Sequence, residues 1–445
     1  MSNNSVESNE MDLIDHTHDP ARRSWVQSAN GHSEFPIQNL PFGVFKQGGR
    51  QRGGVAIGDQ ILDLDAALEL GAFSGDVVDI ARTASLDRLN KFMAMGKEAS
   101  TSLRSALSEL LSEHNPNAGK LTQALIPQSD ASMQLPCDIG DFTDFLTSLP
   151  HTDRLGRLKG LAEPVPAAFK SLPVAYHGRS STIRVNGTPV VRPTGQWRRA
   201  DGKLVCAPVE SLDYEVELGA LIGRGNELAV PIPVGQAQQH IFGYCLVNDW
   251  SAKGIQWFEQ ILGPFLGKSF MTSVSPWVVT SQALVPFRSP ARVRTDDDPT
   301  LFPYLVSEAD LASGRLAVEL SANLRTAAMR EQGAPGRRVN VSDLQCMYWT
   351  FAQMLSHHTS NGCSLRAGDL LASGTLSGET PDSMACLSER TAGGTKPLDL
   401  GNGEVRGWLL DGDEVVIEGH AHKAGFVSIG FGSCGGVVKP ALYKD

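Results

Sequence analysis

The sequence has no continuous apolar run close to the roughly 20 residues that a membrane-spanning helix needs. Its first residues also lack the hydrophobic core of a signal peptide, so we expect neither membrane association nor secretion. Basic residues are scarce: 39 Lys and Arg stand against 49 Asp and Glu, which gives a formal net charge of -10. Because phosphate binding requires a concentrated basic surface, this balance excludes nucleic acid as a partner.

Cysteine is sparse as well. The seven cysteines include no Cys-x-x-Cys pair, so neither a disulfide framework nor a thiolate zinc site is predicted. A reducing, cytoplasmic location fits this usage. With 445 residues, of which 41% are hydrophobic and 20% are charged, the chain is long enough for two packed cores.

Three segments follow one another along the chain. Residues 1–33 are polar with few apolar anchors, so we predict a disordered tail. Residues 34–130 are expected to form a small β-barrel with a helical connection. Within them, 54–64 has the pattern of two short strands around a Gly-Asp-Gln turn, and 76–113 has helical spacing. Residues 131–445 contain short apolar runs separated by turn residues, which is typical of a β-rich domain.

Acidic residues lie in one predicted strand and directly after another. In the strand 212–222, Glu215 and Glu217 share one face. Neighbouring ionised carboxylates repel unless a cation lies between them, although an isolated Glu-x-Glu more often lies on a solvated strand face. The strand 241–247 is apolar throughout and leads into Asp249, which we expect near the core. Three carboxylates without thiolates favour Ca²⁺ or Mg²⁺ over zinc.

Two further predictions concern local structure. His151 lies in a segment rich in Thr, Ser and Pro, for which we predict a loop, and a lone loop histidine is usually a surface residue. A helix is predicted to begin at Ser342, whose hydroxyl can cap the first turn while Gln345 reaches back, and to end near Asn361.

Several collinear blocks of the sequence resemble the fumarylacetoacetate hydrolase family. The blocks are 35–37, 54–64, 141–145, 172–179, 248–252, 262–270 and 368–375. The resemblance covers nearly everything after residue 34. It implies a mainly β, α+β fold with an SH3-like N-terminal barrel, a C-terminal mixed β-roll, and a homodimer built through the C-terminal domains.

The resemblance also implies roles for individual residues. The family's metal-binding carboxylates correspond to Asp144, Glu215, Glu217 and Asp249. A second, structural Mg²⁺ would lie at Lys268 and Thr272. His151 corresponds to the catalytic base and Glu389 to the acid that orients it, while Gln256 and Lys268 correspond to groups that stabilise an oxyanion. Substrate contacts correspond to Tyr176, Gln256 and Thr375.

These residue types suit hydrolysis of the carbon–carbon bond between two carbonyl groups of a 1,3-diketone. A neutral imidazole held by a carboxylate takes a proton from water, and a lysine with an amide holds the oxyanion. A divalent ion holds the enolate that leaves. The family substrate is fumarylacetoacetate, cleaved to fumarate and acetoacetate in the catabolism of tyrosine and phenylalanine.

Three positions depart from the family pattern. Leu146 and Gln260 replace tyrosines, and Gly160 replaces an arginine that binds the substrate's carboxylate. One interpretation is that Arg157 or Lys159 restores this contact and fumarylacetoacetate remains the substrate. The other is that the chain acts on a less anionic or bulkier 1,3-diketone or β-keto acid. A decarboxylase or keto–enol isomerase of the same family, and a non-catalytic scaffold whose metal ion only fixes a dimer, are further alternatives.

Overall fold

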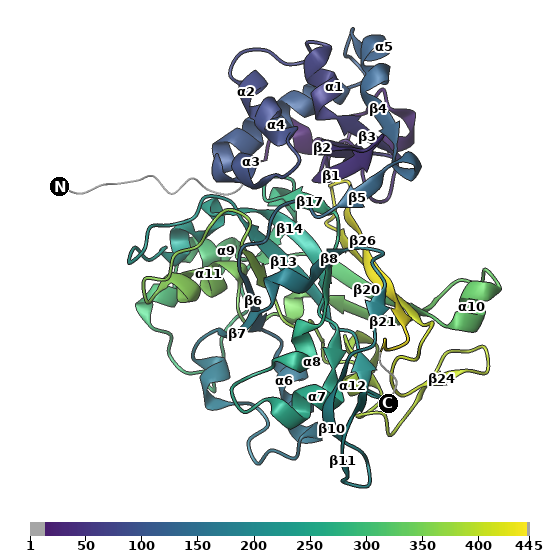
Figure 1. Cartoon of the computed structure of the whole chain (residues 1–445). Coiled ribbons are helices and arrows are strands. Elements are labelled where there is room, and N and C mark those ends of the chain that lie inside the picture. Colours follow the sequence, from purple (N-terminus) through teal and green to yellow (C-terminus); the bar gives the residue numbers. More distant parts are fainter. Residues whose placement is uncertain (1–13, 443–445) are drawn as a thin grey trace.

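The computed structural model describes residues 14–442. In Figure 1 the elements up to β5 (Ser132–Gln134) form the upper part, and the rest of the chain forms the lower part. Both parts contribute to one 13-stranded sheet, which is continuous because β1 (Phe42–Gln47) pairs antiparallel with β17 (Trp277–Thr280). The mainly β, α+β fold class predicted from the sequence is confirmed.

The upper part contains the predicted hairpin. Its strands β2 (Arg50–Ile57), β3 (Gln60–Asp63) and β4 (Leu125–Pro127) follow β1 across the sheet. Ile57 lies opposite Gln60, so Gly58 and Asp59 form the turn. Gly58 has a φ of 57° and lies against Ser28, where a Cβ would clash, so this turn requires glycine.

Helices cover this part of the sheet. They are α1 (Leu64–Glu69), α2 (Val77–Ala84), α3 (Asn90–Ala94), α4 (Lys97–Leu111) and α5 (Ala118–Leu121). The helical connection predicted over 76–113 is therefore present as α2, α3 and α4. In α4, Leu103, Leu107 and Leu111 lie four residues apart and are fully buried, which anchors the helix by its apolar face.

The prediction of a disordered tail is wrong for residues 14–33, while residues 1–13 lie outside the described part of the chain. The segment contains the 3₁₀ helices η2 (His16–His18) and η3 (Gln27–Ala29), and Thr17 and Val26 are buried. The His18 ring contacts the carbonyl of Gln282 at 2.8 Å. A contact across 264 residues supplies an anchor that local composition does not reveal.

One hydrogen-bonded pair joins the beginning of the barrel segment to the lower part. Glu34 contacts the His420 ring through Oε1 and accepts the Gly432 N–H through Oε2 at 2.9 Å. The bond to Glu34 raises the pKa of His420, although burial opposes the shift. A pKa that is raised in the folded state stabilises the fold below the unfolded value of about 6.5. This stability is lost as the pH rises through the folded pKa.

We therefore expect Glu34→Gln to lower the free energy of unfolding by about 1 kcal/mol in mildly acidic buffer. The difference should shrink as the pH rises above the folded pKa of His420. Urea unfolding of both proteins across this pH range measures it. Glu113→Gln, a change of the same kind far from His420, is the control, and a pH-independent difference would contradict the prediction.

The lower part contributes the other strands of the large sheet. They are β6 (Phe142–Leu146), β7 (Val174–Gly178), β8 (Ile183–Val185), β13 (Val216–Ile222), β14 (Ile241–Asn248), β16 (Thr272–Val274) and β22 (Leu370–Ala372). β13 lies between β14 and β22 and is buried throughout. β22 pairs parallel with β6, so Ala372 lies opposite Asp144.

The strand predicted over 212–222 is divided in two. β12 (Leu212–Asp213) pairs with β15 (Ser251–Ala252), and β13 begins only at Val216. The buried carboxylate of Asp213 accepts the backbone N–H groups of Leu387 and Ser388 at 2.7 and 2.8 Å. These bonds tie the chain to another segment at this point, which interrupts the strand.

A five-stranded sheet packs against the large one. It contains β9 (Val190–Val191), β20 (Val318–Arg325), β21 (Arg337–Asp343), β25 (Glu414–Ala421) and β26 (Ile429–Lys439). The two sheets approach closely where Gly419 lies on Leu246, because a Cβ at this position would come within 2.7 Å of the Leu246 side chain. Short paired strands complete the lower part: β10 (Thr194–Arg198) with β11 (Leu204–Pro208), β18 (Arg288–Ser289) with β19 (Arg315–Leu316), and β23 (Leu398–Asp399) with β24 (Val405–Arg406).

Seven short helices lie around these sheets in the described residues. They are α6 (Leu149–Leu158), α7 (Lys253–Glu259), α8 (Leu266–Ser269), α9 (Glu308–Ser313), α10 (Ala327–Glu331), α11 (Phe351–Thr359) and α12 (Leu387–Arg390). The helix predicted from Ser342 begins too early, since Ser342 pairs with Leu320 in the sheet. The capping box belongs to Thr350 and Gln353, at the start of α11.

Candidate active site

Three strands of the large sheet deliver carboxylates to one place. Asp144 lies on β6, Glu217 on β13, and Asp249 directly follows β14. One oxygen from each lies within 4.8 Å of the others, and all three residues are buried. Because β13 lies between β14 and β22, and β22 pairs with β6, residues far apart in sequence meet at this point.

Two of the three carboxylates, Asp144 and Glu217, lack hydrogen-bond partners that buried anions need. Asp144 Oδ1 and both oxygens of Glu217 have no hydrogen-bond partner. Burial, followed by the neighbouring carboxylates, raises the pKa of Asp144 and Glu217 well above the usual values. A buried cluster of this kind is costly unless a cation compensates its charge. The donor set is all oxygen, which suits a hard divalent ion.

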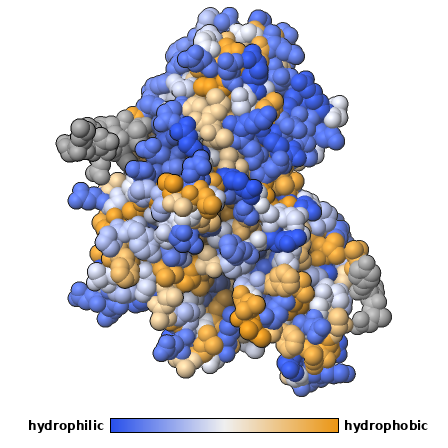
Figure 2. All heavy atoms as spheres, turned by 60° about the vertical axis from the view of Figure 1, so that its left-hand side comes forward, coloured by the Kyte–Doolittle hydropathy of each residue, from blue (hydrophilic) through white to orange (hydrophobic). Residues whose placement is uncertain are grey.

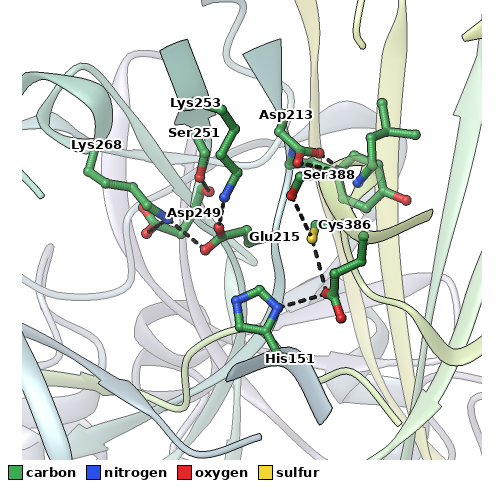
Figure 3. A network of polar contacts seen from close by, with 12 residues as sticks. His151, Asp213, Glu215, Asp249, Ser251, Lys253, Lys268, Cys386 and Ser388 are labelled. Atoms are coloured by element: carbon green, nitrogen blue, oxygen red, sulfur yellow. Dashed lines mark hydrogen bonds and ion pairs between the residues drawn. The ribbon is translucent and has the colours of Figure 1, made fainter. Parts of the chain in front are cut away.

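Glu215 lies apart from this group of three. Lys253 contacts its Oε1, and the Lys268 Nζ donates to its Oε2 at 2.6 Å. Burial opposes ionisation of Glu215, but the two ammonium groups outweigh it and hold the pKa well below the usual value. Glu215 is therefore an ionised carboxylate that is already neutralised by two lysines (Figure 3).

Three donors converge on Asp249. Lys268 Nζ donates to Oδ2 at 2.6 Å, the Tyr176 hydroxyl donates to Oδ2 at 2.7 Å, and Thr272 Oγ1 donates to Oδ1 at 3.0 Å. A protonated lysine has no lone pair, so Lys268 would neighbour a cation rather than ligate it. The second, structural Mg²⁺ expected at Lys268 and Thr272 stays a prediction.

His151 lies in helix α6, so the loop predicted there is wrong. The Ser148 hydroxyl caps the helix by accepting the His151 N–H at 3.2 Å, and Pro150 occupies the first turn. Proline is well tolerated there because its missing N–H has no partner inside the helix. The Ser-x-Pro-His pattern is therefore typical of the start of a helix, and this signal for α6 is present in the sequence.

The contact expected between His151 and Glu389 is present. The His151 Nδ1 lies 2.7 Å from Glu389 Oε2, and both residues are buried. Glu389 also accepts from Ser377 at 2.6 Å and from Cys386 at 3.1 Å, while Arg154 lies 3.2 Å from its other oxygen. Burial raises the pKa of Glu389, but His151 and these hydrogen bonds lower it further, to about 2.

A cavity of about 600 Å³ opens onto this arrangement. Its polar lining includes Asp144, His151, Lys159, Tyr176, Glu215, Gln256, Lys268 and Thr375. Its apolar lining includes Leu146, Leu155, Leu161, Pro164, Pro166, Val174 and Leu262. Gln256 Oε1 and Thr375 Oγ1 are buried without a hydrogen-bond partner, so both are available to a ligand. The cavity therefore combines a polar end with an apolar wall.

The chain is similar to known proteins over most of its length. The family description "Fumarylacetoacetate (FAA) hydrolase C-terminal" matches residues 142–439, and "Fumarylacetoacetase N-terminal" matches residues 38–136. A fumarylacetoacetase of Homo sapiens is 44% identical over 420 residues, which cover 92% of this chain and 97% of that protein. The chain belongs to the fumarylacetoacetate hydrolase family.

Other similarities agree with this family. A fumarylacetoacetase of Oryza sativa subsp. japonica is 42% identical over 432 residues, which cover 94% of this chain and 98% of that protein. A solved fumarylacetoacetate hydrolase from Exiguobacterium antarcticum shares the fold, with a TM-score of 0.50 and 18% identity over 90% of this chain and 99% of that one. The family and the hydrolase class predicted from the sequence are confirmed. Among residues 14–442, no helix is both apolar and long enough to cross a membrane.

The positions that depart from the family pattern lie differently around the cavity. Leu146 is part of the wall, whereas Gln260 and Gly160 are not among the lining residues, and substrate contacts of Leu146 and Gln260 stay predictions. Gln260 instead accepts a hydrogen bond from Lys159 Nζ at 3.2 Å. Arg157 pairs with Asp153 at 2.7 Å on the exposed side of α6. Of the two cations considered as replacements for the family arginine, Lys159 alone borders the cavity.

Three residues of the site, Lys253, Arg154 and Cys386, were not predicted from the sequence. Lys253 is completely buried and contacts Glu215, and the other two contact Glu389. Lys253 has one sequence signal, because it follows the strand end that carries Asp249 by four residues. Arg154 and Cys386 come from separate helices that meet only in the folded protein, and we find no local signal for them.

Proposed function

We propose that this protein hydrolyses the carbon–carbon bond of fumarylacetoacetate to give fumarate and acetoacetate. The observation that carries the proposal is the His151–Glu389 pair, because His151 lines the same cavity as Asp144, Lys268 and Gln256. The relatives named fumarylacetoacetase, which match almost from end to end, support the substrate. Release of fumarate from fumarylacetoacetate by the purified protein tests it, and absence of turnover would overturn it.

We assign the role of general base to His151. Glu389 is ionised and accepts a hydrogen bond from the Nδ1–H of His151. This bond fixes the tautomer of His151 that has a lone pair on Nε2. The ring contacts Glu389 and lines the cavity together with Glu215, so it connects the orienting acid to the polar lining of the cavity. Nε2 takes a proton from water as the water attacks the carbonyl carbon, and later delivers it to the leaving group.

We assign stabilisation of the oxyanion to Lys268 and Gln256. Two of the three N–H groups of Lys268 are held by Glu215 and Asp249, which fixes the ammonium and leaves the third for the substrate. Gln256 lines the cavity and offers its amide from helix α7. Donors that are fixed before the reaction stabilise developing negative charge most effectively.

Asp144, Glu217 and Asp249 would hold a divalent cation, Ca²⁺ or Mg²⁺. The unpaired oxygens and raised pKa values of Asp144 and Glu217 support this assignment, and an Asp249 oxygen lies within 4.8 Å of theirs. When bound, the ion would supply positive charge that stabilises the leaving group as an enolate. Without this charge the leaving group would be an unstable carbanion. Glu215 would keep the two lysines in place, and its role as a fourth ligand stays a prediction.

Lys159 is proposed to bind the distal carboxylate of the substrate. Burial lowers the pKa of Lys159 and the nearby Lys253 adds to this effect, so an anion in the cavity would relieve an unfavourable environment. Its hydrogen-bond partner, Gln260, is neutral, so the charge of Lys159 is compensated only in part, by Glu215. An ammonium can replace an arginine here as a point charge, without the two parallel hydrogen bonds of a guanidinium.

We therefore expect Lys159→Met to raise the KM for fumarylacetoacetate about 10- to 100-fold with a small change in kcat, as for a lost charge-assisted hydrogen bond. Arg157→Met removes a cation from the same helix outside the cavity and should change KM less than about twofold. Steady-state kinetics measures both variants. Equal effects of the two substitutions would contradict the role of Lys159.

A second candidate function is hydrolysis of a less anionic or bulkier 1,3-diketone. Leu146 favours it, because this side chain adds apolar surface to the cavity wall where the family has a tyrosine. The two substrates are distinguished by comparing kcat/KM for fumarylacetoacetate with that for an uncharged 1,3-diketone. A higher value for the uncharged compound would favour the second candidate.

The remaining alternatives make different predictions. A decarboxylase or keto–enol isomerase needs no base to activate water, so it would retain activity without His151. A non-catalytic scaffold predicts His151 and Glu389 far apart, and their separation of 2.7 Å counts against it.

We retain the homodimer through the lower part as a proposal. Figure 2 shows more hydrophobic surface on that part, and within residues 14–442 only Ile14 and Leu86 among the exposed large hydrophobic side chains precede residue 150. Light scattering tests it.

A further inference from the structure

Beside the oxygen-only group lies a second cluster of metal-binding side chains, formed by His151, Cys386 and Glu389. One ligand atom from each lies within 4.8 Å of the others, and all three residues are buried. Glu389 is the centre of the cluster, because its Oε2 lies 2.7 Å from His151 Nδ1 and 3.1 Å from Cys386 Sγ. Figure 3 shows the Cys386 sulfur and the His151 imidazole in the same network of polar contacts.

The two groups differ in the ions they suit. Asp144, Glu217 and Asp249 offer only oxygen, whereas the second cluster offers a nitrogen, a sulfur and an oxygen. Imidazole with thiolate is the ligand set of Zn²⁺ and of related ions such as Co²⁺, and Ca²⁺ and Mg²⁺ have little affinity for either. The protein therefore presents one site for hard cations and one for thiophilic cations, and each includes a residue that lines the cavity.

The ligands of this cluster can neutralise the charge of a bound Zn²⁺ ion. The thiol of Cys386 releases its proton to solvent, Glu389 is already ionised, and the imidazole remains neutral. The two anionic ligands then compensate the two positive charges of the ion. An ion reaches the cluster through the cavity, since His151 forms part of the cavity wall.

Coordination of the ion would prevent His151 from acting as a general base. When the ion takes the lone pair of Nδ1, the ring proton moves to Nε2, the nitrogen that would otherwise accept a proton from water. We propose that His151, Cys386 and Glu389 form an inhibitory site for a thiophilic divalent ion, distinct from the site that supports activity. The inhibition rests on the proposed function of His151, whereas the binding does not.

Cobalt binding tests the site without reference to activity. With the oxygen-only group filled by excess Ca²⁺, Co²⁺ should give a near-ultraviolet thiolate-to-cobalt absorption band that saturates at one equivalent. Cys386→Ser and Cys386→Ala should abolish the band, and Cys206→Ser, a change at an exposed cysteine, should retain it. Thermal melting checks that each variant is folded. Persistence of the band in both Cys386 variants would overturn the proposal.

Inhibition is then measured with Zn²⁺ at saturating Ca²⁺. We expect the half-inhibiting Zn²⁺ concentration to rise at least about tenfold in Cys386→Ser, relative to its own uninhibited rate, as for loss of a group that supports a metal site. Relief of inhibition by Ca²⁺ to the same extent in parent and variant would place Zn²⁺ at the carboxylates and overturn the proposal. A cobalt band in a protein that does not hydrolyse fumarylacetoacetate would sustain the metal site and defeat the proposed function.

Discussion

Replacement of His151 by alanine is expected to reduce kcat for fumarylacetoacetate about 10²- to 10⁴-fold, the range usual for loss of a general base. The His151 imidazole lines the cavity, and the contact of its Nδ1 with Glu389 fixes its tautomer. The oxyanion donors and the carboxylates stay in place, so KM should change little. Steady-state fumarate release measures the effect.

A matched control is available on the opposite wall. His177 is exposed on β7 and borders the same cavity, so His177→Ala should leave kcat within about twofold of the parent. Near-complete activity of His151→Ala would contradict hydrolysis by activated water and favour the decarboxylase or isomerase alternative. Loss of activity in both variants would point to damage of the cavity rather than of the base.

Replacement of Glu217 by glutamine is expected to move function and stability in opposite directions. Both Glu217 oxygens lack hydrogen-bond partners, and burial with two neighbouring carboxylates opposes ionisation. Removing this charge should stabilise the metal-free protein by about 1–3 kcal/mol, the range for relieving an uncompensated buried polar group. The same change removes a ligand, so Ca²⁺ affinity should fall at least about 100-fold, with loss of nearly all activity at low Ca²⁺.

Thermal unfolding with and without Ca²⁺ separates the two effects. Ca²⁺ should raise the Tm of the parent, because an ion that binds the folded state alone stabilises it, and it should hardly shift the Tm of the variant. Glu227→Gln, at an exposed position, should respond to Ca²⁺ as the parent does. An equal Ca²⁺ shift in parent and Glu217→Gln would show that the ion binds elsewhere.

The sequence predicts the elements of the site better than their connections. Alternation along 212–222 identified Glu217, and the apolar run before Asp249 identified a strand end, since both depend on local periodicity. The break before Val216 was missed, because it results from Asp213 bonding to a backbone 174 residues away. Pairing of Glu215 with Lys253 is equally non-local, so local periodicity could not reveal the lysine partner of this acid.

Residues that resemble helix or loop only by composition were predicted less well. Ser342 and Gln345 have the spacing of a capping box, but the strand partner Leu320 prevails over that local preference. Conversely, the Pro that suggested a loop around His151 occupies the first turn of α6, where proline is favourable. Role assignments for Tyr176, Thr375 and Thr272 came from the family resemblance, and no periodicity would have supplied them.

The pairing of β1 with β17 has a consequence for how the chain unfolds. A break between the two parts would leave β17 with unsatisfied backbone donors and acceptors along an open sheet edge, which is prone to aggregation. It would also expose side chains of a core to which both parts contribute, among them Phe42 and Phe242. A fragment beginning at residue 137 should therefore be poorly soluble, and the intact chain should melt in a single cooperative transition.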